Sequence, residues 1–349
     1  MKRTILALIL ICAFGLFSLV SCVSSPHGPE SAQTPGSDPK EPTQDAPTGA
    51  DYSAVFAALD AVPQDLSNYT RESARAVQDA QNAIRYGLDA SEQETVNGFA
   101  EALRASLDAL KPVKTFSSIS EIIPYVDSLG IDFEDLAGFS LDGYFENAVL
   151  PETSDAGEAY YRDCYYLGDS ITLYMHRFSN LDGSHIYGVA SINPQNAAED
   201  KLVSLSSGAP ATFAEAMREM MPKRIVITIG TNSMLMDSSD YLRYFARLIE
   251  DLKAACPNAQ IIIQSTPPLT HAYEANMVKL TNRNINRSNL LLAGLAAYEG
   301  VYFLNSAEAL KDQSGALDPK FDLGEGYGHI NRDAYDVWEN YLRTHAIEN

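Results

Sequence analysis

Cysteine and basic residues are scarce in this chain. Four Cys in 349 residues are too few for a fold built on disulfides. The 25 Lys and Arg stand against 46 Asp and Glu, a net charge of −21, which argues against nucleic acid as a partner because binding to phosphates depends on Lys and Arg. Charged residues make up only 20% of the chain, whereas 46% of the residues are apolar. That apolar share is enough for one large or two smaller domains, and it excludes wholesale disorder.

The first 21 residues have the pattern of a secretory signal. Lys2 and Arg3 precede the almost wholly apolar residues 4–20. The run ends in Leu19-Val20-Ser21-Cys22, which resembles the bacterial lipobox and implies cleavage before Cys22 and lipidation of that residue. Because each buried CH₂ group contributes about 0.8 kcal/mol, several acyl chains would hold the protein stably on the outer face of the cell membrane. An ordinary signal peptide and an uncleaved anchor helix are the alternatives.

Residues 22–50 are predicted to form a disordered tether. Six of the 17 prolines lie between residues 23 and 50, and almost no apolar residue accompanies them. Such a segment cannot bury enough surface to offset the entropy that is lost on ordering. The tether would therefore carry the folded part of the protein away from the membrane.

Residues 51–112 are predicted to form a small bundle of three helices. Apolar residues recur at helical spacing from Asp51 to Val62, from Thr70 to Leu88 and from Ser91 to Leu110. Asp51 is the expected cap of the first helix, and Ser91 with Glu94 has the spacing of a capping box for the third. The stripes hold no pattern of metal ligands or paired carboxylates, so no chemistry is expected in this module.

Part of this module resembles the FIVAR-type module of wall-associated surface proteins. The resemblance rests on residues 65–70, Ala83, and the spacing of Leu103, Leu107 and Leu110. It implies a spacer or a module that adheres to glycans. A helical stalk without a ligand is the alternative.

From residue 163 to residue 349 the pattern alternates between strands and helices. Helical patterns such as 213–221 and 241–249 lie between short apolar runs, each of which ends at a glycine or a polar residue. Because such strands are buried on both faces, the pattern predicts a parallel α/β sheet. Residues 113–162 are predicted to be a lead-in segment that packs on this domain. The apolar runs are 164–167, 185–187, 225–229, 261–263 and 301–304.

Three polar segments of this domain carry residues that can do chemistry at the carboxyl ends of strands, where parallel sheets bind ligands. Ser170, in Gly168-Asp169-Ser170, opens a helix whose dipole favours negative charge, although Ser or Asp here could act only as a helix cap. Asn232, in Gly230-Thr231-Asn232, is a neutral donor suited to an oxyanion. His329 lies in a glycine-rich polar segment, which makes it the best candidate base among the six His.

The order of Gly-Asp-Ser, Gly-x-Asn and a late His resembles the SGNH/GDSL hydrolase family over the last 185 residues, from Tyr165 onward. The resemblance implies a flavodoxin-like three-layer sheet and hydrolysis of carboxylic esters by a serine. Carried over to this chain, it makes Ser170 the nucleophile, Asn232 an oxyanion donor and His329 the general base.

The second oxyanion donor of the family is usually the N–H of a glycine, and two residues here are candidates. If Gly188 matches the leading glycine of the usual Gly-x-x-Gly spacing, the donor position falls on Ser191. A backbone N–H does not depend on the side chain, so Ser191 could act as the donor. The sequence does not decide whether Gly188 or Ser191 supplies the second N–H of the oxyanion hole.

The acid that orients the base is the clearest departure from the family pattern. It usually stands three residues before the His, and that position is Gly326 here. Glu325 lies four residues before His329, and Asp322 lies seven before it. We expect Glu325 to be the acid; Asp322, or a Ser–His dyad without an acid, are the alternatives, because loss of the acid need not abolish catalysis.

The sequence thus predicts a lipid-anchored cell-surface esterase that removes acyl groups, such as acetyl, from glycans. An O-acyltransferase with the same site, and a surface adhesion protein with a dead hydrolase domain, are the alternatives. The expected mechanism needs neither a metal ion nor a cofactor. Cys164 and Cys256 are expected to be two buried free thiols, with a disulfide between them as the alternative.

Overall fold

The computed structural model describes residues 49–326 and 328–347. The predicted signal peptide, Cys22 and nearly all of the predicted tether lie outside the described residues. One compact unit begins at Gly49. Among the helices of the described residues, none combines the length and the apolarity that crossing a bilayer requires.

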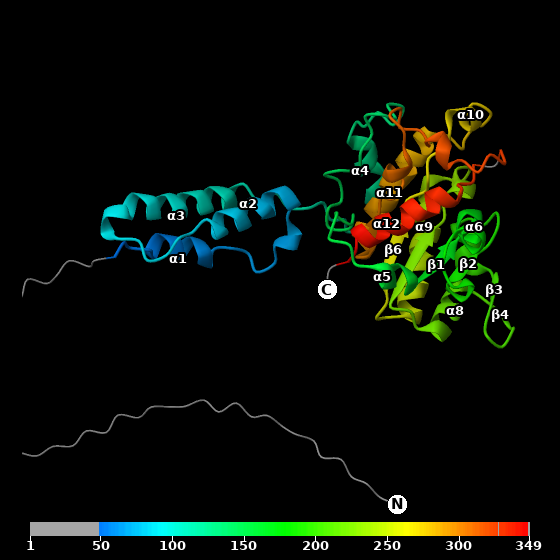
Figure 1. Ribbon diagram of the computed structural model, residues 1–349, viewed down its shortest axis with the longest axis horizontal. Coiled ribbons are helices and arrows are strands. Elements are labelled where there is room, and N and C mark those ends of the chain that lie inside the picture. The colour runs from blue at the N-terminus through cyan, green and yellow to red at the C-terminus, as the bar shows by residue number, and fades with distance from the viewer. Residues whose placement is uncertain (1–48, 327, 348–349) are drawn as a thin grey trace, which may run out of the picture. The chain divides into compact units, whose positions relative to one another are not determined.

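The first part of this unit is the predicted bundle of three helices: α1 (Ser53–Asp60), α2 (Arg71–Asn82) and α3 (Gln93–Asp108) (Figure 1). Asp51 accepts the Ser53 N–H at 2.8 Å from the position before the N-cap of α1, which is Tyr52. The helices bury their apolar faces against one another, which is what the sequence periodicity predicts. The fully buried residues are Val55, Ala58, Val77, Val96, Ala100 and Leu103.

Two details of this bundle differ from the prediction. Helix α2 ends at Asn82, so Ile84 and Leu88 pack against the bundle from the loop that follows it. The regular spacing of apolar residues there indicates buried positions, but these positions are not helical. The capping box lies two residues earlier than Ser91 and Glu94, since Glu92 accepts the Asp89 N–H at 3.3 Å. A 3₁₀ turn over Ala90–Glu92 begins the winding before α3, which moves the cap upstream.

The rest of the unit is built on a sheet of five parallel strands, which confirms the predicted α/β fold. The strands lie in the order β2-β1-β5-β6-β7, the order of flavodoxin-like sheets. A separate antiparallel pair of strands, β3 (Val203–Ser204) and β4 (Pro210–Ala211), was not predicted. The strands of the main sheet are β1 (Cys164–Gly168), β2 (Ile186–Gly188), β5 (Arg224–Thr228), β6 (Gln260–Gln264) and β7 (Tyr302–Leu304).

Helices cover both faces of the sheet, as Figure 1 shows. Neighbouring residues of one strand face opposite sides, so Leu167 and Tyr166 of β1 lie in different hydrophobic cores. Helices α8, α9 and α11 share the core of Leu167, and helices α6 and α12 share that of Tyr166. The bounds are α6 (Ser170–Phe178), α8 (Phe213–Met220), α9 (Ser238–Ala255), α11 (Asn282–Glu299) and α12 (Arg332–Thr344).

Residues 113–162 pack against this sheet and its helices. Ile122 and Val126 of α4 (Ile122–Ser128) are buried in the core that α9 and α11 share. Val149 forms a parallel bridge to Phe303 and so extends the sheet beyond β7. The remaining short helices are α5 (Glu158–Arg162), α7 (Pro194–Glu199) and α10 (His271–Glu274).

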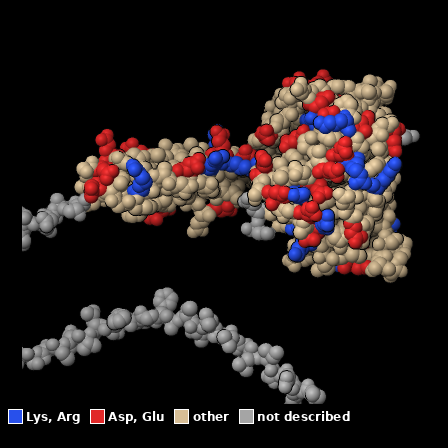
Figure 2. Space-filling view, in the orientation of Figure 1, with Lys and Arg blue, Asp and Glu red and all other residues tan. Residues whose placement is uncertain are grey.

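Acidic side chains are spread widely over the face of the molecule that Figure 2 shows, and Lys and Arg lie among them. Among the described residues, basic groups form ion pairs such as Arg247 with Glu199 at 3.1 Å and Arg243 with Asp240 at 2.7 Å. These pairs are exposed, so each contributes at most about 1 kcal/mol to stability.

Candidate active site

The polar segments singled out in the sequence meet at the carboxyl end of the sheet. Strands β1 and β5 are parallel neighbours, with Gly168 opposite Thr228. The chain after β1 enters α6, and the chain after β5 enters a 3₁₀ turn over Thr231–Ser233. Strand β1 pairs with β2 on its other side, so the point where the strand order reverses lies here, which is where such sheets bind ligands.

Asp169 ties these two strand ends together. Its carboxylate caps α6 by accepting the Ile171 N–H at 3.0 Å, and its other oxygen accepts the Thr231 hydroxyl at 2.8 Å and the Gly230 N–H at 3.4 Å. The side chain is 1% exposed. Burial raises the pKa of Asp169, because desolvation disfavours the carboxylate, and the hydrogen bonds oppose that effect. The Asp of Gly-Asp-Ser therefore has a structural role, which fixes the residue that follows it.

Ser170 and His329 are in direct contact although 159 positions separate them in the sequence. Nε2 of His329 lies 3.0 Å from Oγ of Ser170. Ser170 is the first residue of α6, and the imidazole of His329 is 14% exposed. The chain around His329 is fixed on both sides: Asp322 forms a bridge with Ile330, and Asn331 caps α12 by accepting the Ala334 N–H.

Glu325 is the carboxylate that the structure places beside His329. Its Oε2 lies 3.7 Å from Nδ1 of the imidazole. The Tyr174 hydroxyl donates to the same Oε2 at 2.9 Å, and Arg177 approaches Oε1 at 3.9 Å. The carboxylate of Asp322 instead accepts the Gly324 N–H at 3.0 Å, within its own turn.

The two candidates for the second oxyanion donor differ in backbone setting. Gly188 packs so closely on α6 that a Cβ at this position would lie 2.2 Å from the Leu173 nitrogen, so this glycine is explained by packing alone. Ser191 has a φ of 61°, in the left-handed region that favours glycine. Asn232 lies in the turn after β5, next to Thr231, and its side chain is exposed.

The sequence of this sheet domain also matches a family model. Residues 166–337 match the model described as GDSL-like lipase/acylhydrolase. They form a GDSL-like lipase/acylhydrolase domain. The GDSL-like domain makes this chain a carboxylic ester hydrolase.

Solved structures similar to this chain include a lipase and a carbohydrate esterase. A GDSL-like lipase from Bacteroides thetaiotaomicron is 15% identical, with a TM-score of 0.40, over 65% of this chain and 97% of its own. A family 3 carbohydrate esterase from Clostridium thermocellum is 16% identical, with a TM-score of 0.34, over 51% of this chain and 94% of its own. At scores this low the assignment rests on the family match.

Sequence reasoning missed three residues of the GDSL-like domain that contact the site. Thr231 binds Asp169, whereas Tyr174 and Arg177 approach Glu325. A signal for the last two was present, because they follow Ser170 by four and seven positions and so lie on the same face of α6. The helix was predicted, but the partner of that face was not.

The two cysteines of the described residues are free thiols. Cys164 and Cys256 are both buried and are not joined to each other. Burial raises the pKa of Cys164 to about 11, and burial also raises that of Cys256, so neither thiol is activated as a nucleophile. In the described part of the chain, no group of three or more His, Cys, Asp or Glu side chains is arranged to hold a metal ion.

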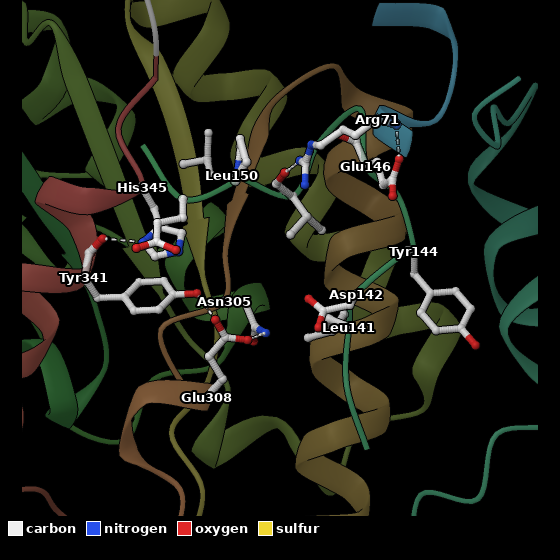
Figure 3. Close-up of a pocket in the computed structure, with 14 residues that line it drawn as sticks. Arg71, Leu141, Asp142, Tyr144, Glu146, Leu150, Asn305, Glu308, Tyr341 and His345 are labelled. Carbon is white, nitrogen blue, oxygen red and sulfur yellow. Dashed lines mark hydrogen bonds between the residues drawn. The ribbon is translucent and has the colours of Figure 1, made fainter. Parts of the chain in front are cut away.

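A cavity of about 260 Å³ is lined by segments other than those that carry Ser170 and Glu325 (Figure 3). In its wall, Glu308 accepts hydrogen bonds from the Tyr341 hydroxyl and, at 2.7 Å, from the Asn305 amide. The ring of His345 stacks on that of Tyr341 with centroids 3.8 Å apart. Burial lowers the pKa of His345. These side chains are held by one another, and the cavity is separate from the Ser170 site.

Proposed function

We propose that the GDSL-like domain hydrolyses esters with Ser170 as the nucleophile and His329 as the general base. The observation that carries the proposal is the 3.0 Å contact between Nε2 of His329 and Oγ of Ser170. A nucleophile within hydrogen-bond reach of its base is the arrangement that activates a serine hydroxyl.

In the first step, His329 takes the proton of Ser170 as Oγ attacks the ester carbonyl. The resulting imidazolium then protonates the departing alcohol, which leaves an acyl-serine. A water molecule loses its proton to His329 and attacks this acyl group, and the proton returns to Ser170 as the acid is released. Glu325, 3.7 Å from Nδ1, stabilises the imidazolium that forms in each step.

The oxyanion of each tetrahedral intermediate is proposed to bind three donors: the N–H of Ser170, the N–H of Ser191 and the Asn232 carboxamide. Ser170 begins α6, so its N–H lies among the unpaired donors of a helix N-terminus. Ser191 is preferred over Gly188 because its left-handed backbone matches that of a glycine, whereas Gly188 is explained by its packing on Leu173.

The proposed substrate is an acylated glycan at the cell surface, with acetyl as the first acyl group to test. The support for this comes from the sequence before the sheet domain: a lipobox-like Cys22, a proline-rich tether and a FIVAR-like module. These would hold the hydrolase on the outside of the membrane, near wall or environmental polysaccharides. A Cys22→Ala variant should then move from the membrane fraction to the soluble fraction of the producing cell.

The decisive experiment labels the mature protein with a fluorophosphonate and measures turnover of p-nitrophenyl esters and acetylated glycans. The wild-type protein should be labelled once and should release acetate, and Ser170→Ala should lose the label and nearly all turnover. A protein that takes no label would support the adhesion-protein alternative. Transfer of the acetyl group to an added sugar in preference to water would support the acyltransferase.

A further inference from the structure

One face of α6 carries three residues that point toward the same loop. Ser170, Tyr174 and Arg177 occupy positions i, i+4 and i+7 of this helix, which a helical period places above one another. Ser170 contacts His329, and Tyr174 and Arg177 contact Glu325. The nucleophile and the groups that hold the acid therefore belong to one rigid element.

Tyr174 contacts both the acid and the base. Its hydroxyl donates to Oε2 of Glu325 at 2.9 Å, and this is the oxygen that lies 3.7 Å from Nδ1 of His329. Its ring lies against the imidazole, with centroids 4.4 Å apart and planes inclined by 31°. The tyrosine thus fixes the carboxylate by a hydrogen bond and limits the tilt of the imidazole by contact.

Glu325 depends on such a partner because its own backbone holds it weakly. It lies between Gly324 and Gly326, whose φ values of 77° and 73° are in the left-handed region. Its side chain is 36% exposed, and Arg177, at 3.9 Å, is 67% exposed. An exposed ion pair of that length adds little, so the shorter hydrogen bond from Tyr174 is the stronger restraint on the carboxylate.

We propose that Tyr174 is a positioning residue, which keeps Glu325 beside His329 during ester hydrolysis. This inference rests on the proposed function of Ser170 and His329. It accounts for an acid that stands one residue earlier than the family pattern: a longer side chain on a glycine-flanked loop is held in place by a hydroxyl from the helix of the nucleophile.

The test is a double-mutant cycle with Tyr174→Phe, Glu325→Ala and the variant that carries both, assayed with p-nitrophenyl acetate. Phe keeps the ring and removes only the hydroxyl. Tyr174→Phe should lower kcat roughly 3- to 10-fold and leave KM within about twofold, because binding of substrate is not affected. Glu325→Ala should lower kcat more, and Tyr174→Phe should then have no further effect, because the hydroxyl has lost its acceptor.

The fraction of active sites, titrated with a fluorophosphonate, and the thermal midpoint are measured for every variant, so that misfolding is separated from positioning. Tyr160→Phe is the matched control. Tyr160 lies in α5, before β1 and so at the other end of the sheet, and its hydroxyl accepts the Ile347 N–H at 2.9 Å. The kcat of this variant should equal that of the wild type.

Equal losses of kcat from Tyr174→Phe with and without Glu325 would overturn the inference, and so would an unchanged kcat in either single variant. These outcomes leave the proposed function intact. An active Ser170→Ala enzyme, or a wild-type protein that takes no fluorophosphonate label, would instead remove the proposed function itself.

Discussion

Asp169 offers the sharpest test of how the fold builds the site, and Asp169→Ala is the substitution to make. It removes the acceptor of three donors: the Ile171 N–H, the Gly230 N–H and the Thr231 hydroxyl. Loss of a helix cap costs about 1 kcal/mol, and each further buried donor left unpaired costs about 1–3 kcal/mol. Removal of a buried charge, whose pKa is raised by desolvation, offsets part of this. We expect a net loss of about 2 kcal/mol in the free energy of unfolding.

The effect on turnover should be larger than that on stability would suggest. Without Asp169 the turn that carries Asn232 is no longer tied to the start of α6, and a displacement of about 1 Å at a reacting group can cost 10²-fold in rate. We expect kcat to fall about 10- to 100-fold on that ground. Urea unfolding gives the first quantity, and initial rates with p-nitrophenyl acetate give the second.

The matched control is Asp237→Ala. Asp237 also caps a helix, α9, by accepting the Ser239 N–H at 2.9 Å, but it is exposed, and the side-chain hydrogen bond that it accepts also comes from Ser239, within its own helix. Its loss should cost about 1 kcal/mol of stability and leave kcat unchanged. If the two variants lost equal stability and both kept wild-type kcat, the tie between the strand ends would have no part in building the site.

Two further predictions follow from the site and the core. Asn232→Ala should lower kcat about 10²- to 10³-fold with little change in KM, because one oxyanion donor is worth about 3–4 kcal/mol of barrier; initial rates that match the wild type would remove Asn232 from the mechanism. Burial raises the pKa of Cys164 from 9.0 to about 11, so the native state holds this proton more tightly than the unfolded chain does. The contribution of Cys164 to stability is then full below pH 9.0 and is lost as the pH rises to 11, by roughly 3 kcal/mol. Urea unfolding across that range should show wild-type stability falling relative to that of Cys164→Ala, and parallel curves would contradict the assignment.

The sheet could be predicted from the sequence because buried parallel strands appear as short apolar runs with polar ends. All five strands of the main sheet were predicted in this way, within one residue at each end. Strands β3 and β4 were missed, because each is only two residues long and gives no period. Helix α2 was predicted too long, because Ile84 and Leu88 are buried from a loop and continue the helical spacing.

The meeting of the Ser170 and Asn232 segments was also within reach of the sequence, because both follow parallel strands and so lie at one edge of the sheet. His329 follows no strand, contrary to the prediction: it lies between the 3₁₀ turn Pro319–Phe321 and α12, so its contact with Ser170 was within reach only through the family resemblance. The setting of the acid was not, because it depends on side-chain reach from an irregular loop. Spacing alone left Glu325, Asp322 and no acid as alternatives. The structure puts Glu325 next to His329 and turns the Asp322 carboxylate to the Gly324 N–H.

Helix α6, which begins with Ser170, therefore positions both the nucleophile and the acid of the site. Asp169 fixes the start of α6 to the turn after β5, and Tyr174, one turn along the helix, holds the carboxylate that faces His329. A loop that contains three glycines of positive φ, at positions 324, 326 and 328, has many conformations of similar energy. It can supply an acid at a defined place only if something outside the loop selects one of them. Because Ser170 and Tyr174 belong to the same short helix, whatever places the nucleophile also places the acid, and the loop need not be rigid by itself.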